Sequence, residues 1–291
     1  MKRFMKTDDL ARDDRFTRTP VPLDFLMAEE VTVEQVEETM ATIMANDEMR
    51  KMMEDSSGAS GAPNLFRRVR PDEDDAPMFI KTQMHGIFMG EMQALEAAGR
   101  SAWDFTDDDE LPWKFQLDMA RQCWDETRHV EIYSALLDHV EAEIGEFPEN
   151  LFLFEFGCSD DPAERVVGVN RCLEGLALDV FNDTIRFGKT AEDEAIWRSV
   201  DYVAADEVTH VRFGQVWSKA LTEGDPARRQ KVVAFQRKVD RAFSLGGLRG
   251  SYDGANVEAF LPLATEFRKL AGFSDADIAE VAGAGPKIKK A

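Results

Sequence analysis

Paired cysteines are missing from this 291-residue sequence, and a long apolar run is missing from its first residues. Its three cysteines, Cys123, Cys158 and Cys172, form no Cys-x-x-Cys pair, which is consistent with reduced thiols and argues against a rubredoxin-like iron site. The stretch from Met1 to Arg15 alternates in charge and contains no apolar run. We therefore expect a cytoplasmic protein with no signal peptide and no membrane span.

Basic residues are also scarce, with 35 Lys and Arg against 56 Asp and Glu and a net charge of −21. Such a chain offers few cations to the phosphates of a nucleic acid, so we expect no nucleic-acid partner. The same charge disfavours an acidic carrier protein or an anionic membrane surface. A small free molecule is the simpler substrate to expect.

Only four histidines are present, and two of them end similar motifs: Asp-Glu-Thr-Arg-His over residues 125–129 and Asp-Glu-Val-Thr-His over residues 206–210. On a helix, a glutamate and a histidine three residues apart lie on one face about one turn apart, so both can reach the same metal ion. Two motifs predict two ions. The alternative is that both Glu-x-x-His pairs are surface salt bridges of an ordinary helical bundle.

Each motif glutamate stands within an apolar stripe of helical spacing. The stripe around Glu126 contains Met119, Cys123, Val130, Tyr133, Leu137, Val140 and Ile144, and that around Glu207 contains Ile196, Val200, Val203, Gly214, Trp217 and Leu221. Upstream of each motif, a further acid, Glu91 or Glu174, occupies a second apolar stripe. Surface salt bridges would leave four acids at core positions unexplained.

The two halves of this region resemble each other. Glu-Met-Gln-Ala-Leu-Glu over residues 91–96 aligns with Glu-Gly-Leu-Ala-Leu-Asp over 174–179, with acids at the first and sixth places. Glu126 follows Glu91 by 35 residues, and Glu207 follows Glu174 by 33. The chain therefore contains a duplicated helix pair.

Four buried carboxylates need compensation, because an unpaired buried carboxylate costs on the order of several kcal/mol. Two divalent cations would match four glutamates in charge. One Glu from each of two helices plus Glu-x-x-His from each of the others is the ligand set of di-iron and di-manganese bundles. Mixed carboxylate and imidazole ligands suit iron or manganese, whereas structural zinc more often recruits Cys. The predicted metal ligands are Glu91, Glu126, His129, Glu174, Glu207 and His210.

Over residues 78–222 the arrangement resembles the ferritin-like di-iron carboxylate superfamily, and the stretch 206–214 resembles a little-characterised bacterial branch known only as ferritin-like proteins. The resemblance implies that Glu91 and Glu174 are terminal ligands, that the two motif glutamates bridge the ions, and that each motif histidine caps one ion. The first motif also has the sequence Asp-Glu-x-Arg-His, which resembles the form of this motif in bacterial multicomponent di-iron monooxygenases. There the Asp holds a ligand histidine's free N–H, a role that the resemblance gives to Asp125 and Asp206.

The second motif departs from that pattern, because Thr209 stands where the first has Arg128. Any clamp between this arginine and an aspartate is therefore expected on one side only.

The fold class that we expect is all-α, a ferritin-like four-helix bundle with additional N- and C-terminal helices. Residues 1–77 form an N-terminal extension, 78–222 the bundle, and 223–291 C-terminal helices that pack on it. Within the extension we expect a helix over 31–54, followed by a loop over 55–77 that either covers the site or simply connects. The C-terminal region is expected to form helices near 227–243, 256–271 and 274–282, followed by a basic, solvated tail over 287–290.

Several other residues have both a functional and an ordinary interpretation. Tyr133, one turn after His129, is a core aromatic unless it serves the metals. His85 is expected at the surface or beside a ligand, His139 in solvent, and Cys123 as a small buried thiol. Glu96 and Asp179 are expected to be polar partners between helices. Small residues beside the predicted ligands would leave room for O2 and a substrate: Ala94, Ala98, Ala177 and Gly214.

The function that these residues favour is a non-haem di-iron oxygenase or oxidase, with O2 as co-substrate and a small organic substrate. Hydroxylation, N-oxygenation and oxidative cleavage all stay open, as do Fe/Fe or Mn/Fe ions, the external electron donor and a homodimer. The alternatives are a ferroxidase or peroxidase that handles iron or peroxide, and a non-enzymatic bundle with a structural metal. A substrate-sized apolar cavity beside Glu91 and Glu174 would favour the oxygenase, and a polar channel the ferroxidase.

Overall fold

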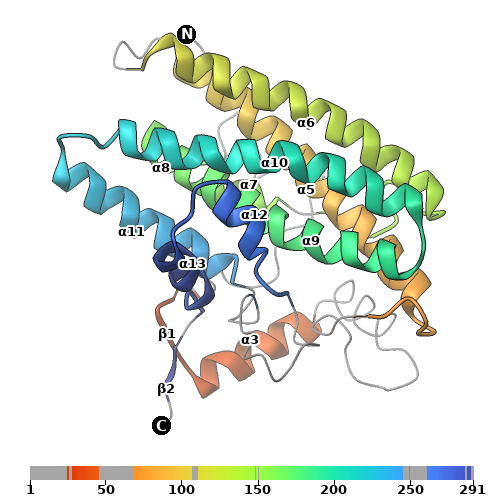
Figure 1. Cartoon of the computed structure of the whole chain (residues 1–291). Helices are drawn as coiled ribbons and strands as arrows, with labels where there is room; N and C mark the ends of the chain where they lie inside the picture. Colours follow the sequence, from red (N-terminus) through yellow and green to blue (C-terminus); the bar gives the residue numbers. More distant parts are fainter. Residues whose placement is uncertain are drawn as a thin grey trace.

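Helices make up nearly all of the regular structure in the computed structural model, which describes residues 25, 28–45, 69–106, 111–147, 149, 151–244, 249, 261–285 and 287–289. The expected all-α class is confirmed for these residues. The four long helices of the core are α5 (Ala76–Asp104), α6 (Trp113–His139), α9 (Glu174–Thr190) and α10 (Glu194–Ala220). Helix α5 packs against α6, α9 packs against α10, and α6 lies beside α10 (Figure 1).

One apolar cluster joins the four long helices. It contains Phe88 of α5, Tyr133 of α6, Phe181 of α9 and Val203 of α10, all buried. Tyr133 and Val203 belong to the predicted apolar stripes around the two motifs, and Phe88 and Phe181 lie in the helical segments upstream of them. The bundle core therefore forms as the helical periodicity predicts.

The ends of the long helices follow local sequence signals. Pro112 immediately precedes α6, and Asp193 caps α10 by accepting a hydrogen bond from the backbone N–H of Ile196 at 3.0 Å. The stripe through Glu126 predicts a helix as far as Ile144, but α6 ends at His139, and Glu141 has a φ of 57°. That left-handed residue reverses the chain before the apolar pattern ends.

Helix α9 is preceded by α8 (Pro162–Val166) and a π-helical segment, η3 (Val167–Leu173). This segment packs closely on α10 at Gly214, where an added Cβ would lie 2.8 Å from the backbone nitrogen of Arg171. Gly214 is therefore a contact point between helices. The expectation that it leaves room for O2 or a substrate is wrong, because backbone already fills that space.

Shorter elements surround the bundle. The helices are α3 (Val33–Ala45), α7 (Phe152–Gly157), α11 (Pro226–Ala242), α12 (Thr265–Leu270) and α13 (Asp275–Ala282). Two short strands, β1 (Glu30–Thr32) and β2 (Lys287–Lys289), pair in parallel, with Glu30 opposite Lys287. The basic tail that we expected in solvent therefore joins a strand near the other end of the chain, and Lys289 contacts Glu30 at 2.5 Å.

Some expected elements lie partly outside the described residues. These are residues 46–54 of the helix over 31–54, most of the loop over 55–77, and the first residues of the helix over 256–271. Within the described residues, no helix combines the length and apolar character needed to cross a membrane.

Candidate metal centre

The four long helices bring all six predicted ligands into one buried cluster at the centre of the bundle. Each helix contributes at the expected position: Glu91 from α5, Glu126 and His129 from α6, Glu174 from α9, and Glu207 and His210 from α10. Their donor atoms form two groups, within each of which all atoms lie within 4.8 Å of one another. Both groups contain the glutamates of the two motifs, Glu126 and Glu207.

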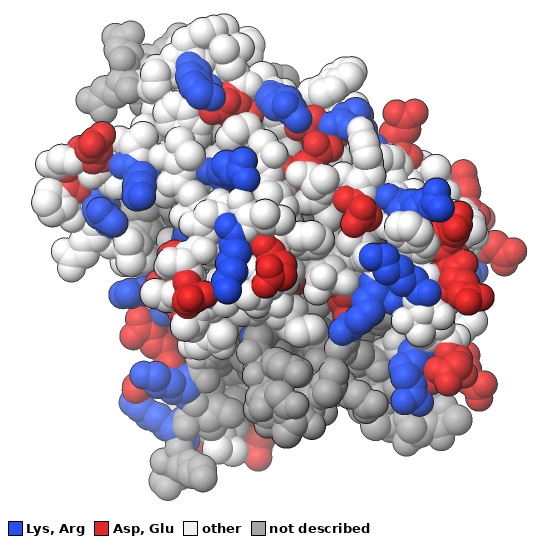
Figure 2. All heavy atoms as spheres, in the orientation of Figure 1, with Lys and Arg blue, Asp and Glu red and all other residues white. Residues whose placement is uncertain are grey.

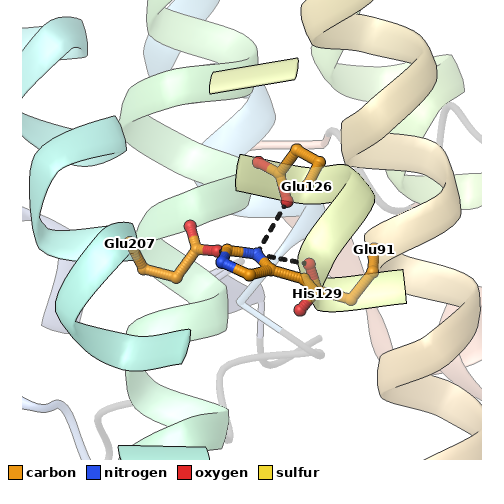
Figure 3. A group of neighbouring side chains, drawn as sticks. All are labelled: Glu91, Glu126, His129 and Glu207. Carbon is orange, nitrogen blue, oxygen red and sulfur yellow. Dashed lines mark hydrogen bonds and ion pairs between the residues drawn. The ribbon is translucent and has the colours of Figure 1, made fainter. Parts of the chain in front are cut away.

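The first group surrounds Nδ1 of His129 (Figure 3). This nitrogen lies 3.2 Å from Oε2 of Glu91, 3.0 Å from Oε2 of Glu126 and 3.1 Å from Oε1 of Glu207. Three carboxylates thus converge on one imidazole nitrogen, which is an arrangement able to hold a cation.

The second group surrounds Nδ1 of His210. This nitrogen lies 3.1 Å from Oε1 of Glu126 and 3.0 Å from Oε2 of Glu207. Each shared glutamate therefore directs one oxygen to each histidine. Glu174 completes the group and is buried like the others.

The outer nitrogens of the two histidines face aspartates of the opposite helix. Nε2 of His129 lies 3.4 Å from Oδ2 of Asp206, and Nε2 of His210 lies 3.4 Å from Oδ2 of Asp125. Arg128 donates to both aspartates. The expectation of a one-sided clamp is therefore wrong, because Arg128 lies between α6 and α10 and reaches the aspartate of each helix. An aspartate on Nε2 leaves Nδ1 as the nitrogen available to a metal.

Sequence reasoning missed two residues around the cluster. Gln122 donates to Oε1 of Glu174 at 2.6 Å and to Oε1 of Glu126 at 3.1 Å, and it accepts a hydrogen bond from Asn170. Arg121 donates to Oδ2 of Asp125 at 2.6 Å. Each lies four residues before its partner on α6, a helical spacing that was available as a signal.

Burial and mutual charge divide the cluster into two kinds of carboxylate. Burial, together with the neighbouring carboxylates, raises the pKa of Glu91 and of Glu174 well above the usual value. Burial also raises the pKa of Glu126, but the charges and hydrogen bonds of His210 and His129 outweigh it and hold that pKa below its usual value. Metal-free, the cluster thus favours neutral carboxyls at Glu91 and Glu174 and a carboxylate at Glu126.

The histidines show the complementary shift. Burial lowers the pKa of His129, but the close carboxylates of Glu126, Glu207 and Glu91 outweigh this and raise the pKa. The pKa of His210 is raised in the same way by Glu207 and Glu126 against the effect of burial. Protons on these imidazoles offset the carboxylate charge that cations would otherwise neutralise.

The donor set fits a pair of divalent cations. Oε1 of Glu207 is buried and makes no hydrogen bond, although it lies close to Nδ1 of His129. A buried carboxylate oxygen without a hydrogen-bond donor is costly unless a positive charge faces it, which is a protonated His129 in the metal-free cluster and would be a bound cation in the loaded one. Carboxylate oxygens together with one imidazole nitrogen per group are ligands that can hold such an ion.

A cavity of about 290 Å³ adjoins the cluster between α5 and α9. Glu91 and Glu174 line it, together with Ala94, Ala177 and mainly apolar side chains. Two of the four small residues expected to leave room therefore do so. Ala98 is buried but does not line this cavity.

Tyr133 lies in the core with its ring stacked on Phe181 at 6.0 Å between centroids. Its hydroxyl is buried and has no hydrogen-bond partner within the described part of the chain. Burial, with the charges of Glu91 and Glu207, raises the pKa of this phenol. The ring is a core aromatic, as the ordinary interpretation expects.

The two remaining histidines lie away from the cluster. His85 is buried, and its Nε2 accepts a hydrogen bond from Gly145 N–H and lies 3.5 Å from Oε1 of Glu149. The prediction of a surface position for His85 is therefore wrong. His139 is exposed and pairs with Asp193 at 2.8 Å.

Glu96 and Asp179 occupy equivalent places in the two halves of the repeat, but their environments differ. Asp179 is buried and binds Arg249 and Arg268 from the C-terminal region. Glu96 is half exposed and pairs with Arg100 of its own helix, so the expected partnership between helices holds only for Asp179. Cys123 is a partly buried free thiol.

Comparison with known proteins gives one family. The family model described as a protein of unknown function (DUF455) matches residues 26–279. No curated protein and no solved structure matches the chain.

Proposed function

We propose that this chain, which belongs to the DUF455 family of proteins of unknown function, is a ferritin-like non-haem di-iron oxygenase or oxidase. It would use O2 to oxidise a small organic molecule. Fe/Fe is the preferred pair of ions, with Mn/Fe as the alternative.

The observation that carries the proposal is the pair of interlocking ligand groups with Glu126 and Glu207 in common. In this arrangement the shared glutamates would each contact both ions, Glu91 and His129 would hold one ion, and Glu174 and His210 the other. Four carboxylates balance two dications in a site whose ligand side chains are buried. The crossed aspartates keep each histidine's Nδ1 directed inward.

Bound iron supplies the electrons that O2 accepts at such a site, and an external donor restores them. The chain itself provides ligand geometry, proton-bearing groups and apolar walls. For a hydroxylation, one oxygen atom enters a C–H bond of the substrate and the other leaves as water, with two electrons and two protons drawn from the donor.

The apolar cavity beside Glu91 and Glu174 favours this function over its alternatives. A ferroxidase needs a polar route for Fe(II), whereas this cavity is lined mainly by aliphatic and aromatic side chains. A structural metal needs no cavity at its ligands at all. Space for an organic molecule next to the two terminal carboxylates therefore supports an oxygenase.

Anaerobic loading with Fe(II), followed by O2 exposure under stopped-flow absorbance, tests the proposal. Wild type should bind two irons per chain and give a transient visible band. Glu126→Ala and Glu207→Ala should lose both the stoichiometry and the band, while Glu131→Ala, an exposed acid on the same helix as Glu126, should keep them. Wild-type protein without stoichiometric iron uptake would contradict the di-iron proposal.

A further inference from the structure

The cavity between α5 and α9 is elongated along the two helices. Gln83 and Glu91 both line it and stand eight residues apart on α5, which corresponds to about 12 Å along a helix. At the end away from the cluster, Gln83 donates to Oγ1 of Thr184 at 3.3 Å. The cavity thus runs from the two terminal carboxylates to the pair formed by Gln83 and Thr184.

Among the described residues, its lining is largely hydrocarbon and includes no basic side chain. Apolar side chains from both helices and from α7 form the walls: Phe79, Ile87, Leu153, Leu176, Val180 and Phe181. The charged lining residues are Glu91 and Glu174 at the inner end and Asp183 toward the outer end. Asp183 already pairs with Arg186.

Two glycines within α5 keep the cavity open. An added Cβ at Gly86 would meet nothing within 4 Å, and one at Gly90 would meet only Cδ1 of Leu153, at 3.6 Å. Glycine inside a helix costs roughly 0.5–1 kcal/mol relative to alanine. No neighbouring backbone requires these glycines, in contrast to Gly214, so the space that they leave is what distinguishes them.

We infer that this cavity binds an uncharged, elongated and largely hydrocarbon molecule, with one end against Glu91 and Glu174. The inference rests on the proposed function in calling that molecule the substrate. In the metal-free protein, a carboxylate or phosphate on the ligand would lose its hydration without meeting a basic side chain among the described lining residues, and it would lie near acidic side chains at both ends of the cavity.

Calorimetric titration with octan-1-ol and octanoate tests the inference, because the two probes have the same chain length and differ in charge. The titrations use the metal-free full chain, because a cation held beside Glu91 and Glu174 would itself attract octanoate. Octan-1-ol should bind at least about ten-fold more tightly than octanoate. Gly90→Leu should weaken octan-1-ol binding at least about ten-fold by filling the cavity, whereas Gly90→Ala, with the same backbone effect and a smaller side chain, should bind nearly as wild type.

Octanoate binding as tight as the alcohol, or undiminished octan-1-ol binding to a folded Gly90→Leu, would overturn the inference. Circular dichroism, together with Zn(II) uptake by a separate sample, establishes that the variant is folded and keeps its ligands. If the protein binds octan-1-ol but fails the iron and O2 experiment, the proposed oxygenase function is contradicted and the inference about the class of ligand stands. If the protein reacts with iron and O2 but does not bind octan-1-ol, only the inference about the class of ligand is contradicted.

Discussion

Asp125 of α6 holds His210 of α10, a residue 85 positions later, with 3.4 Å between Oδ2 and Nε2. The reciprocal contact joins Asp206 to His129 at the same distance. Each helix therefore orients the histidine of the other. The two Glu-x-x-His motifs form one unit, and neither has its complete set of contacts on its own helix.

Asp125→Asn should weaken metal binding by about 10–100-fold, because His210 loses the carboxylate that orients it and raises its basicity. Titration with Fe(II) under anaerobic conditions measures the affinity. Asp138→Asn, an exposed site on the same helix, is the control and should leave binding unchanged. Equal affinities in the two variants would show that the crossed contact does not support the site.

Metal affinity should rise with pH. The pKa values of Glu91, Glu174, His129 and His210 are raised in the metal-free cluster, so these groups retain protons that a cation must displace. Lowering the pH adds protons that compete with the metal, and raising it removes them. Calorimetry in buffers of different ionisation enthalpy counts the protons released. Binding without proton release would contradict this protonation pattern.

Asp179→Ala should destabilise the protein by about 3–5 kcal/mol, because Arg249 and Arg268 would remain buried without their shared carboxylate. Urea unfolding followed by circular dichroism measures the change. Glu96→Ala makes the corresponding change in the first half of the repeat. It should have little effect, because Glu96 is half exposed and pairs only with Arg100.

Gly214→Ala should destabilise the protein by about 1–3 kcal/mol, since the new methyl group would push η3 away from α10. Gly86→Ala is the matched control, as its methyl would meet nothing within 4 Å. That control should stabilise α5 by roughly 0.5–1 kcal/mol. Thermal unfolding of both variants tests the contrast, and a destabilised Gly86→Ala would contradict the account of the cavity.

Tyr133→Phe should leave stability unchanged or raise it by about 1 kcal/mol, because the buried hydroxyl makes no hydrogen bond that the substitution could remove. Urea unfolding of the metal-free protein tests this. A clear loss of stability would show that the hydroxyl has a partner in solution.

The six candidate ligands could be predicted because their positions follow from helix geometry alone. A period of 3.6 residues aligns Glu126 with His129 and places both among apolar neighbours, and the duplication repeats the pattern for Glu207 and His210. The end of α6 could not be predicted in the same way. Its apolar stripe continues to Ile144, but Glu141 adopts a left-handed conformation that no glycine or proline announces.

The sequence by itself determined the four long helices and the four glutamates and two histidines that they direct into the core, because these depend on local periodicity. Only the tertiary structure decided how Asp125 meets His210, where Gln122 donates, and which small residues border a cavity. Ala94 and Gly214 look alike in sequence, yet one lines the cavity and the other lies against backbone. These outcomes depend on how close two helices approach, which is set by packing across the whole bundle and not by spacing along either helix.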